Sequence, residues 1–351
     1  MISISAALCG LIFLIKKERI GEILQLGWPL IALCLCYTAS LAVHPSFTAL
    51  KHSLAVLSIT LFFFFYVQNG STIRRNPIFL IGATMASIAF LMPSLLGLNM
   101  KNFDGGMAFY GMCVIVFLFM GNRPPNSSIA ITIAIAFGAA TSIYGYLIDF
   151  RMLITYGMLL ALCYLLLSWR PGLTRLYRSS FLLLITTIGA TMFFYMNIEN
   201  SLYLTEINDF FIRTTDRPAL SGRQILWPAI ASAISENPWI GLGAGTLPSD
   251  IIDTDFSAHN YYLQVTLQVG LIGLTLALTC VYRIWRELFK AKRKASSLIF
   301  AIATLIIFVL HNASEVIMFQ NALRVAIPAW IIFFIATSSS IREATQSDES
   351  I

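Results

Sequence analysis

Long apolar stretches separated by short polar segments dominate the pattern of this chain. A helix needs roughly 20 apolar residues to cross the hydrocarbon core of a bilayer, and most of the stretches approach that length. We expect transmembrane helices at residues 2–15, 23–43, 52–68, 77–96, 107–121, 128–147, 152–168, 180–198, 259–282, 297–313 and 323–340. The pattern therefore predicts an all-α polytopic membrane protein with about eleven spans.

The composition agrees with this pattern. Of 351 residues, 58% are hydrophobic and only 11% are charged, whereas soluble domains carry about 25% charged residues. A single soluble core could not hide so much apolar surface, so membrane lipids are the expected surroundings. All six cysteines lie inside apolar stretches, and we interpret them as buried apolar side chains and expect no metal site.

The distribution of lysine and arginine predicts which loops are cytoplasmic. When the loops are assigned alternately to two sides, sixteen basic residues fall on one side and seven on the other, and the segment 283–294 contributes most to the bias. The basic side is expected to be cytoplasmic. The net charge of +6 thus reports topology rather than nucleic-acid binding. The run 2–15 precedes its basic residues, the reverse of a signal peptide, and is expected to be a retained helix entering from outside.

One outer loop, 199–258, divides the chain into N-terminal spans (1–198), the loop itself, and C-terminal spans with a short tail (259–351). The loop holds eight acidic residues and three arginines. Loops of this length are uncommon unless they are functional or disordered. An apolar stripe in the loop predicts a helix that starts after Ser221 and stops at Asn237-Pro238. We expect this helix to be amphipathic and to lie on the outer membrane surface.

Cations and a histidine at the outer side are the residues most suited to chemistry. Arg151 stands at the outer end of the seventh span, and Arg223 stands in the first turn of the loop helix, with Arg213 and Arg217 before it. Guanidinium groups bind phosphate oxygens bidentately and stay charged. His259 opens the ninth span, and an imidazole can take a proton from a hydroxyl at neutral pH. Together they predict a diphosphate clamp with a base.

Each of these residues also has an ordinary structural explanation. Arg151 is equally well explained as a partner of Asp149 or as a cation at a helix end. Arg223 is equally well explained as a solvated loop arginine. His259 with Asn260 is typical of a helix start. His311 and Glu315 form HxxxE at the end of the tenth span, which is weak as a metal signal, although polar groups in a membrane are candidates for function.

The strings SGRQILWPAIASAISENPWIGLGAGTLPSD and AHNYYLQVTLQVGLIGL together resemble the superfamily of O-antigen ligases and O-antigen polymerases. Residues 220–275 carry the close likeness, and the remainder matches in span order and in the large outer loop. The resemblance implies an inverting, metal-independent glycosyltransferase of the bacterial inner membrane that uses no cofactor. Members of the superfamily commonly have about twelve spans.

The resemblance also implies roles for individual residues. The superfamily's catalytic histidine falls on His259, and the arginine of its SGR motif falls on Arg223. Another arginine of the superfamily falls on Arg151, although Phe150 precedes it here instead of serine or threonine. Lys101 is the only residue offered where the superfamily uses arginines near the fifth span. Asn260 and Glu315 are further candidates for the site.

These observations favour an O-antigen ligase that moves a glycan from undecaprenyl diphosphate to lipid A-core on the periplasmic face. The alternative is an O-antigen or capsule polymerase that uses a lipid-linked acceptor, and a protein O-glycosyltransferase is a third option. A transporter would instead place polar residues near the midplane in repeated half-helices. The candidate residues here gather at one interface, which favours transfer over transport.

Overall fold

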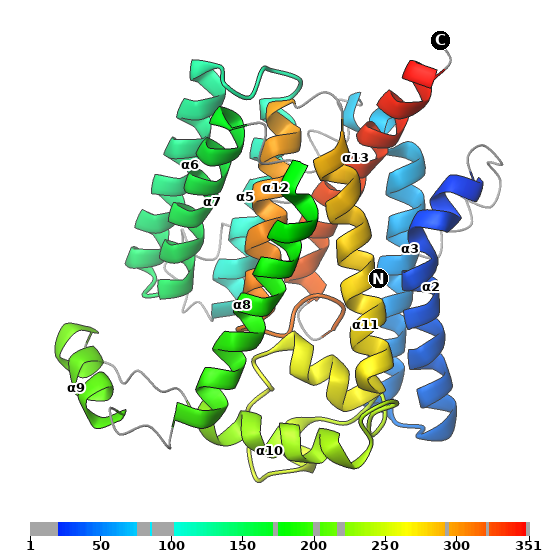
Figure 1. Ribbon diagram of the computed structural model, residues 1–351, viewed down its shortest axis with the longest axis vertical. Helices are drawn as coiled ribbons and strands as arrows, with labels where there is room; N and C mark the ends of the chain where they lie inside the picture. Colours follow the sequence, from blue (N-terminus) through cyan, green and yellow to red (C-terminus); the bar gives the residue numbers. More distant parts are fainter. Residues whose placement is uncertain are drawn as a thin grey trace.

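The computed structural model describes residues 20–75, 85, 102–170, 175–198, 204–215, 222–291, 295–320 and 323–348 (Figure 1). Every regular element in these ranges is helical. Seven helices are long and apolar enough to cross a membrane: α2 (Ile20–Val43), α3 (Phe47–Arg75), α6 (Ser128–Leu147), α7 (Arg151–Trp169), α8 (Tyr177–Asn197), α11 (Tyr261–Lys290) and α13 (Leu323–Asp348). Two shorter apolar helices, α5 (Asn102–Met120) and α12 (Ser296–His311), also belong to the described part of the bundle.

The chain is therefore a multi-pass membrane protein. Nine of the eleven predicted spans coincide with these nine helices. The other two, at 2–15 and 77–96, lie outside the described residues.

The centre of the bundle is formed by α11, α12 and α13 (Figure 1). α13 packs against α3 and α5, while α2 packs against α3 and α11. Aromatic side chains fill this core: Trp330 of α13 stacks on Phe334 with ring centroids 5.3 Å apart and on Phe319 with centroids 5.2 Å apart. The C-terminal helices thus supply the rigid scaffold on which the remaining helices are arranged.

Helices α6 and α7 form a tight antiparallel hairpin because small residues face each other. A side chain at Gly138 would lie 2.7 Å from the carbonyl oxygen of Gly157, too close for any Cβ atom. Ser142 of α6 donates to the carbonyl of Ile154 across the same seam. Small residues let membrane helices approach closely enough to gain dispersion energy without a hydrophobic driving force.

The loop between α8 and α11 contains two helices, α9 (Leu204–Thr215) and α10 (Arg223–Glu236), and a 3₁₀ turn, η3 (Pro248–Asp250). α10 confirms the helix predicted in this loop. Its apolar face packs on α8 and α11 rather than on lipid, because Leu226, Ile230 and Ala233 are buried there. The prediction that this helix lies on the membrane surface is therefore wrong for that face. α9 was not predicted and stands apart from the bundle (Figure 1).

Helix α11 is broken after its first two turns. Val269 and Gly270 leave the helical conformation, and Gly270 has φ +69°. The loop after α10 occupies the break: Leu242 and Gly243 donate to the carbonyls of Leu267 and Gln268 at 2.8 and 3.1 Å. Leu271 and Ile272 in turn donate to Pro238 and Trp239 at 2.8 and 3.3 Å.

We call these four backbone bonds the clasp. They satisfy groups that a break inside a membrane would otherwise leave unpaired. A Cβ atom at Gly270 would overlap the carbonyl of Trp239, so glycine is required there by both space and φ. Two glycines of GLGAG, Gly241 and Gly243, thus serve a backbone contact between the loop and α11, whereas Gly245 packs against Ser46 and Ala49.

Candidate functional site

The start of α11 is fastened to the connection that follows α12. Asn260 caps α11 by accepting a hydrogen bond from the amide of Leu263 at 3.0 Å, and its Nδ2 donates to the carbonyl of Ala313 at 3.1 Å. The amide of Tyr261 donates to the carbonyl of Asn312 at 2.8 Å. Asparagine suits this position because its side chain can cap a helix and donate at the same time. Asn260 thus positions the residue before it.

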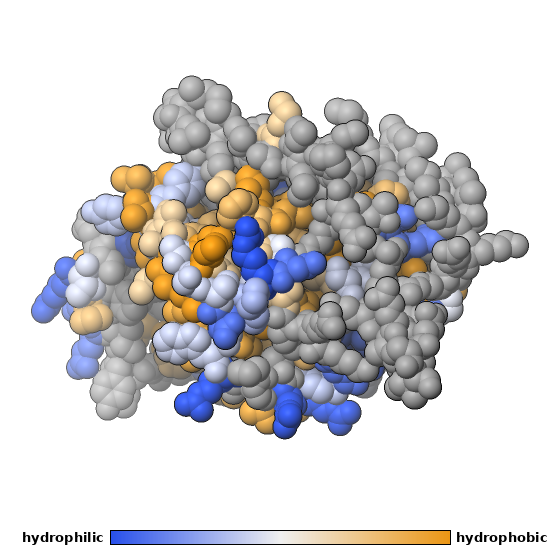
Figure 2. Space-filling model, turned by 90° about the horizontal axis from the view of Figure 1, so that it is seen from above, coloured by the Kyte–Doolittle hydropathy of each residue, from blue (hydrophilic) through white to orange (hydrophobic). Residues whose placement is uncertain are grey.

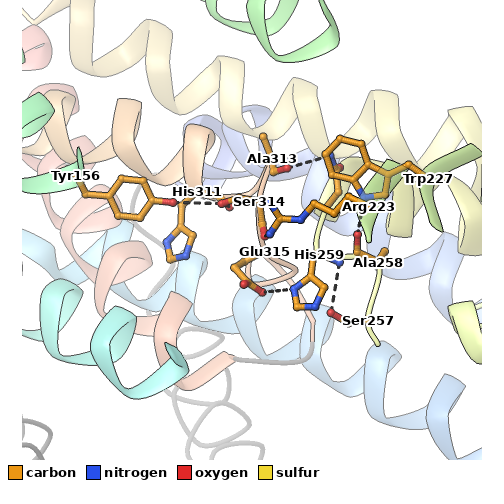
Figure 3. A network of polar contacts seen from close by, with 11 residues as sticks. Tyr156, Arg223, Trp227, Ser257, Ala258, His259, His311, Ala313, Ser314 and Glu315 are labelled. Carbon is orange, nitrogen blue, oxygen red and sulfur yellow. Dashed lines mark hydrogen bonds and ion pairs between the residues drawn. The ribbon is translucent and has the colours of Figure 1, made fainter. Parts of the chain in front are cut away.

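That residue, His259, lies in a strained backbone conformation beside a carboxylate (Figure 3). Its φ is +46°, which is uncommon for a residue with a side chain and is often found at functional sites. Its amide donates to Ser257 Oγ at 3.3 Å, and its Nδ1 lies 3.1 Å from Glu315 Oε2. The side chains of His259 and Glu315 are 31% and 17% exposed. Both groups are therefore held in place and still open to solvent or substrate.

Arg223 is the first residue of α10 and approaches the same cluster from the other side (Figure 3). One terminal nitrogen donates to the carbonyl of Ser314 at 3.0 Å. The guanidinium lies 6.0 Å from the ring centroid of Trp227, whose Nε1 donates to the carbonyl of Ala258 at 2.9 Å. Arg223 is thus held beside Ser314, which precedes Glu315, and beside Trp227, which binds the residue before His259. Its charge adds to the positive end of the α10 dipole.

Behind these residues lies a second layer, of which the sequence singled out only His311. Tyr156 of α7 and Ser314 share a hydrogen bond of 3.2 Å between their hydroxyl oxygens, and Ser314 donates to the carbonyl of His311 at 3.0 Å. The ring of His311 lies 4.8 Å from that of Tyr156, and its Nδ1 lies 3.1 Å from the hydroxyl of Tyr110. This layer fixes the turn that carries Glu315. The only sequence signal for it is the polar run at 311–315 ending an apolar stretch.

The structure gathers four predicted site residues, namely His259, Asn260, Arg223 and Glu315, into what we call the site cluster. Arg151 is exposed at the start of α7, at the same end of the bundle and five positions before Tyr156. Arg213 does not join the cluster, because it is exposed on α9 away from the bundle (Figure 1). The predicted candidates Arg217 and Lys101 lie outside the described residues.

The cluster combines a base held by a carboxylate with a fixed guanidinium. Among the described residues, no three His, Cys, Asp or Glu side chains gather in a way that could hold a metal ion. A proton acceptor beside a cation is suited to activating a hydroxyl and to stabilising an anionic leaving group.

Comparison with known proteins identifies the family. A family model described as O-antigen ligase matches residues 89–278, more than half of the chain. The chain belongs to the O-antigen ligase family. A Rickettsia conorii protein that carries the provisional name of polysaccharide ligase is 27% identical over 138 residues. That match covers 35% of this chain and 33% of the relative, so the chain spans about a third of the length of the curated relative it matches.

The extent of the family match bears on the site. In this O-antigen ligase family member, the matched region includes Arg151, Arg223 and His259. Glu315 and Ser314 lie beyond it, on the connection between α12 and α13. The family pattern thus covers the histidine and the arginines, whereas the carboxylate partner is recognised from the geometry.

Proposed function

We propose that this O-antigen ligase family member transfers a glycan from undecaprenyl diphosphate to lipid A-core on the periplasmic face of a bacterial inner membrane. The observation that carries the proposal is the contact between His259 Nδ1 and Glu315 Oε2, 3.1 Å long and next to Arg223. An ionised carboxylate can only accept a hydrogen bond, so it favours the tautomer with the proton on Nδ1. Nε2 then carries the lone pair that accepts a proton.

In this mechanism a hydroxyl of the acceptor sugar attacks the anomeric carbon of the donor glycan. As the new C–O bond forms, the hydroxyl proton passes to His259 Nε2, and the bond from the anomeric carbon to the phosphate oxygen breaks. Undecaprenyl diphosphate leaves with that electron pair. Attack opposite the leaving group inverts the anomeric centre. Glu315 stabilises the imidazolium, as the buried carboxylate does in hydrolase triads.

Arg223 is placed to bind the leaving diphosphate. Among the described residues, Arg223 uses one of its five N–H donors, on the carbonyl of Ser314, which leaves the others for phosphate oxygens. Charge that develops on the leaving oxygen in the transition state is stabilised by a cation already fixed in position. We assign Arg151 to the far side of the same diphosphate, because it stands at the same end of the bundle.

The sidedness of the site is supported by the distribution of charge. The end opposite α9 and α10 carries hydrophilic side chains among apolar ones (Figure 2). Basic residues occupy the connections at that end, among them Arg123, Arg170, Arg175 and Lys290. Basic loops favour the cytoplasmic side. The site cluster lies at the other end, which we therefore assign to the periplasm.

The test uses purified protein in detergent with undecaprenyl-diphosphate O-polysaccharide and lipid A-core, without added metal. Wild type is expected to attach polysaccharide to the core, His259→Ala to lose transfer, and His44→Ala to retain it. His44 is the matched control because it is an exposed histidine in the connection between α2 and α3.

A polymerase is the alternative outcome of the same assay. If folded wild type leaves the core unmodified and instead joins lipid-linked repeats to one another, the ligase proposal fails. The same result would establish the polymerase, with the same residues acting on a lipid-linked acceptor.

A further inference from the structure

A second polar cluster lies inside the bundle, between α2, α11 and the connection before α13. Six of its members are linked by hydrogen bonds, and Tyr261 lies one turn before one of them on α11. Almost all are buried: Tyr37, His52, Thr246, Tyr261, Gln264, Gln268 and Gln320. We call it the buried seam. Polar side chains in a membrane bundle are costly and are retained for a reason, and the seam is separate from the site cluster.

The directions of the glutamine and tyrosine hydrogen bonds in the seam follow from one backbone oxygen. The carbonyl of Thr246 accepts from Gln264 Nε2 at 2.9 Å and from Gln268 Nε2 at 3.0 Å. Because a carbonyl only accepts, both amide groups must turn their nitrogens toward it. The side-chain oxygens of Gln264 and Gln268 therefore point elsewhere.

The same logic continues along the seam. Gln268 Oε1 accepts the hydroxyl proton of Tyr37 at 3.1 Å. Having donated its only proton, Tyr37 can only accept, and Gln320 Nε2 donates to it. The amide oxygen of Gln320 is thereby turned away as a further acceptor. Exchanging the nitrogen and oxygen of any single side-chain amide would not pair all of these groups, because the orientation of each amide depends on that of its neighbour.

Among the described residues, three polar atoms in the seam consequently have no protein partner: Gln264 Oε1, Gln320 Oε1 and the hydroxyl of Tyr261. All three residues are at most 1% exposed. Tyr261 lies one turn before Gln264 on the same face of α11. Its ring contacts that of Phe319, which adjoins Gln320, and its hydroxyl is an electrostatic neighbour of Tyr37. Tyr261 and Gln320 thus share Tyr37 as a neighbour, and Tyr261 and Gln264 share a face of α11.

We propose that these three atoms bind one ordered water molecule. Two acceptors and one hydroxyl match its capacity, since water can donate to both amide oxygens and accept from Tyr261. Buried waters typically make about three such hydrogen bonds. The bound water would join α11 to the connection before α13, in addition to their direct contacts near Asn260. It is thus a structural ligand that helps to position the start of α11, which carries His259.

Removing the Tyr261 hydroxyl distinguishes a hydrated seam from a dry one, because Tm is expected to fall in the first case and to rise in the second. If water is bound, Tyr261→Phe deletes a hydrogen bond and lowers the apparent Tm by about 1–3 °C. In a dry seam the same change removes a buried unpaired hydroxyl and raises Tm. The aromatic ring is kept in both cases, so packing is preserved. An unchanged or raised Tm overturns the proposal.

Tyr144→Phe is the matched control. The hydroxyl of Tyr144 in α6 is also buried without a protein partner, but it lies outside the seam. Its removal is expected to leave Tm unchanged or raised. A fall in Tm as large as that of Tyr261→Phe would show that the loss is a general effect of removing a tyrosine hydroxyl, and it would overturn the proposal.

The oxygen-rich surroundings would also suit a monovalent cation, and a salt series separates that ligand from water. Wild type and Tyr261→Phe are compared in sodium, potassium and choline chloride at equal ionic strength. Water binding predicts the same Tm difference in all three salts. A difference present in sodium or potassium and lost in choline would overturn the water assignment in favour of a cation.

Discussion

Two histidines packed near the first turns of α11 differ in what their surroundings allow them to do. His259 is 31% exposed and faces a carboxylate at 3.1 Å. His52 is 5% exposed, and its Nδ1 lies 2.8 Å from the carbonyl of Ala244, in the buried seam. One belongs to an open cluster with a carboxylate and a guanidinium, and the other to a closed cluster of glutamine and tyrosine side chains. Exposure and a charged partner, rather than residue type, decide which imidazole can exchange protons with a substrate.

The largest expected effect comes from replacing His259, and the same replacement at His52 tests whether the two histidines are interchangeable. His259→Ala is expected to reduce the rate of glycan transfer by about 10²–10⁴-fold, the usual contribution of a general base, with little change in Tm. His52→Ala is expected to lower Tm while the folded fraction keeps its rate. Transfer assays and thermal unfolding of both variants in one detergent check this. Equal losses of rate would contradict the distinction.

The clasp, which follows the buried seam along α11, is tested at Gly270. Gly270→Ala combines a positive φ with an overlap against the carbonyl of Trp239, and we expect a cost of about 3 kcal/mol in stability. Gly189→Ala in α8 is the control, because an added Cβ there meets nothing within 4 Å. Thermal unfolding should show a large fall in Tm for the first variant and none for the second. A tolerated Gly270→Ala would show that the clasp is dispensable.

Glu315→Gln tests whether the charge of Glu315 in the site cluster assists His259. Glutamine keeps the size of the side chain but removes the charge that stabilises an imidazolium, so the transfer rate is expected to fall about 10–100-fold. In a His259→Ala background the same change is expected to have no further effect, because residues that act as a unit are not additive. The double variant measures this directly. Additive losses would separate Glu315 from His259.

The smallest expected loss of transfer rate concerns the guanidinium of Arg223. Arg223→Lys keeps the charge but loses the planar fork that binds phosphate bidentately, so we expect about a tenfold lower rate. Arg213→Lys is the control, since Arg213 stands on α9 away from the cluster (Figure 1). Initial rates at several donor concentrations compare the two. A larger loss for Arg213→Lys would mean that α9 closes over the donor.

Much of the bundle could be predicted from the sequence, because spans long enough to cross a bilayer are a strong signal. The helix α10 and the residues His259 and Arg223 were also predicted, since their motifs are local in sequence. Glu315 was proposed only as a further candidate, because its contact with His259 joins residues 56 positions apart. No periodicity reports a contact of that kind.

Other features escape prediction for identifiable physical reasons. Tyr261 and Tyr262 stand at a span start, a position typical of interfacial aromatics, yet both are buried. They pack on α12 and the connection after it, where Tyr262 donates to the carbonyl of Val309 and Tyr261 contacts Phe319. Nothing local in the sequence signals the contact of His52 with the carbonyl of Ala244. The face of α10 was assigned to lipid because amphipathicity does not say which apolar surface a helix meets.

The order of synthesis gives the clasp a further consequence. Its bonds join residues 238–243 to 267–272, so it can close as soon as α11 has been made. The carboxylate of Glu315 is synthesised later, after α12, in the connection between α12 and α13. Segments that emerge first generally fold first, and a nascent chain can therefore hold a finished loop and a broken helix while its histidine still has no carboxylate. In the proposed mechanism, the site cluster is therefore complete only after the connection between α12 and α13 has been synthesised.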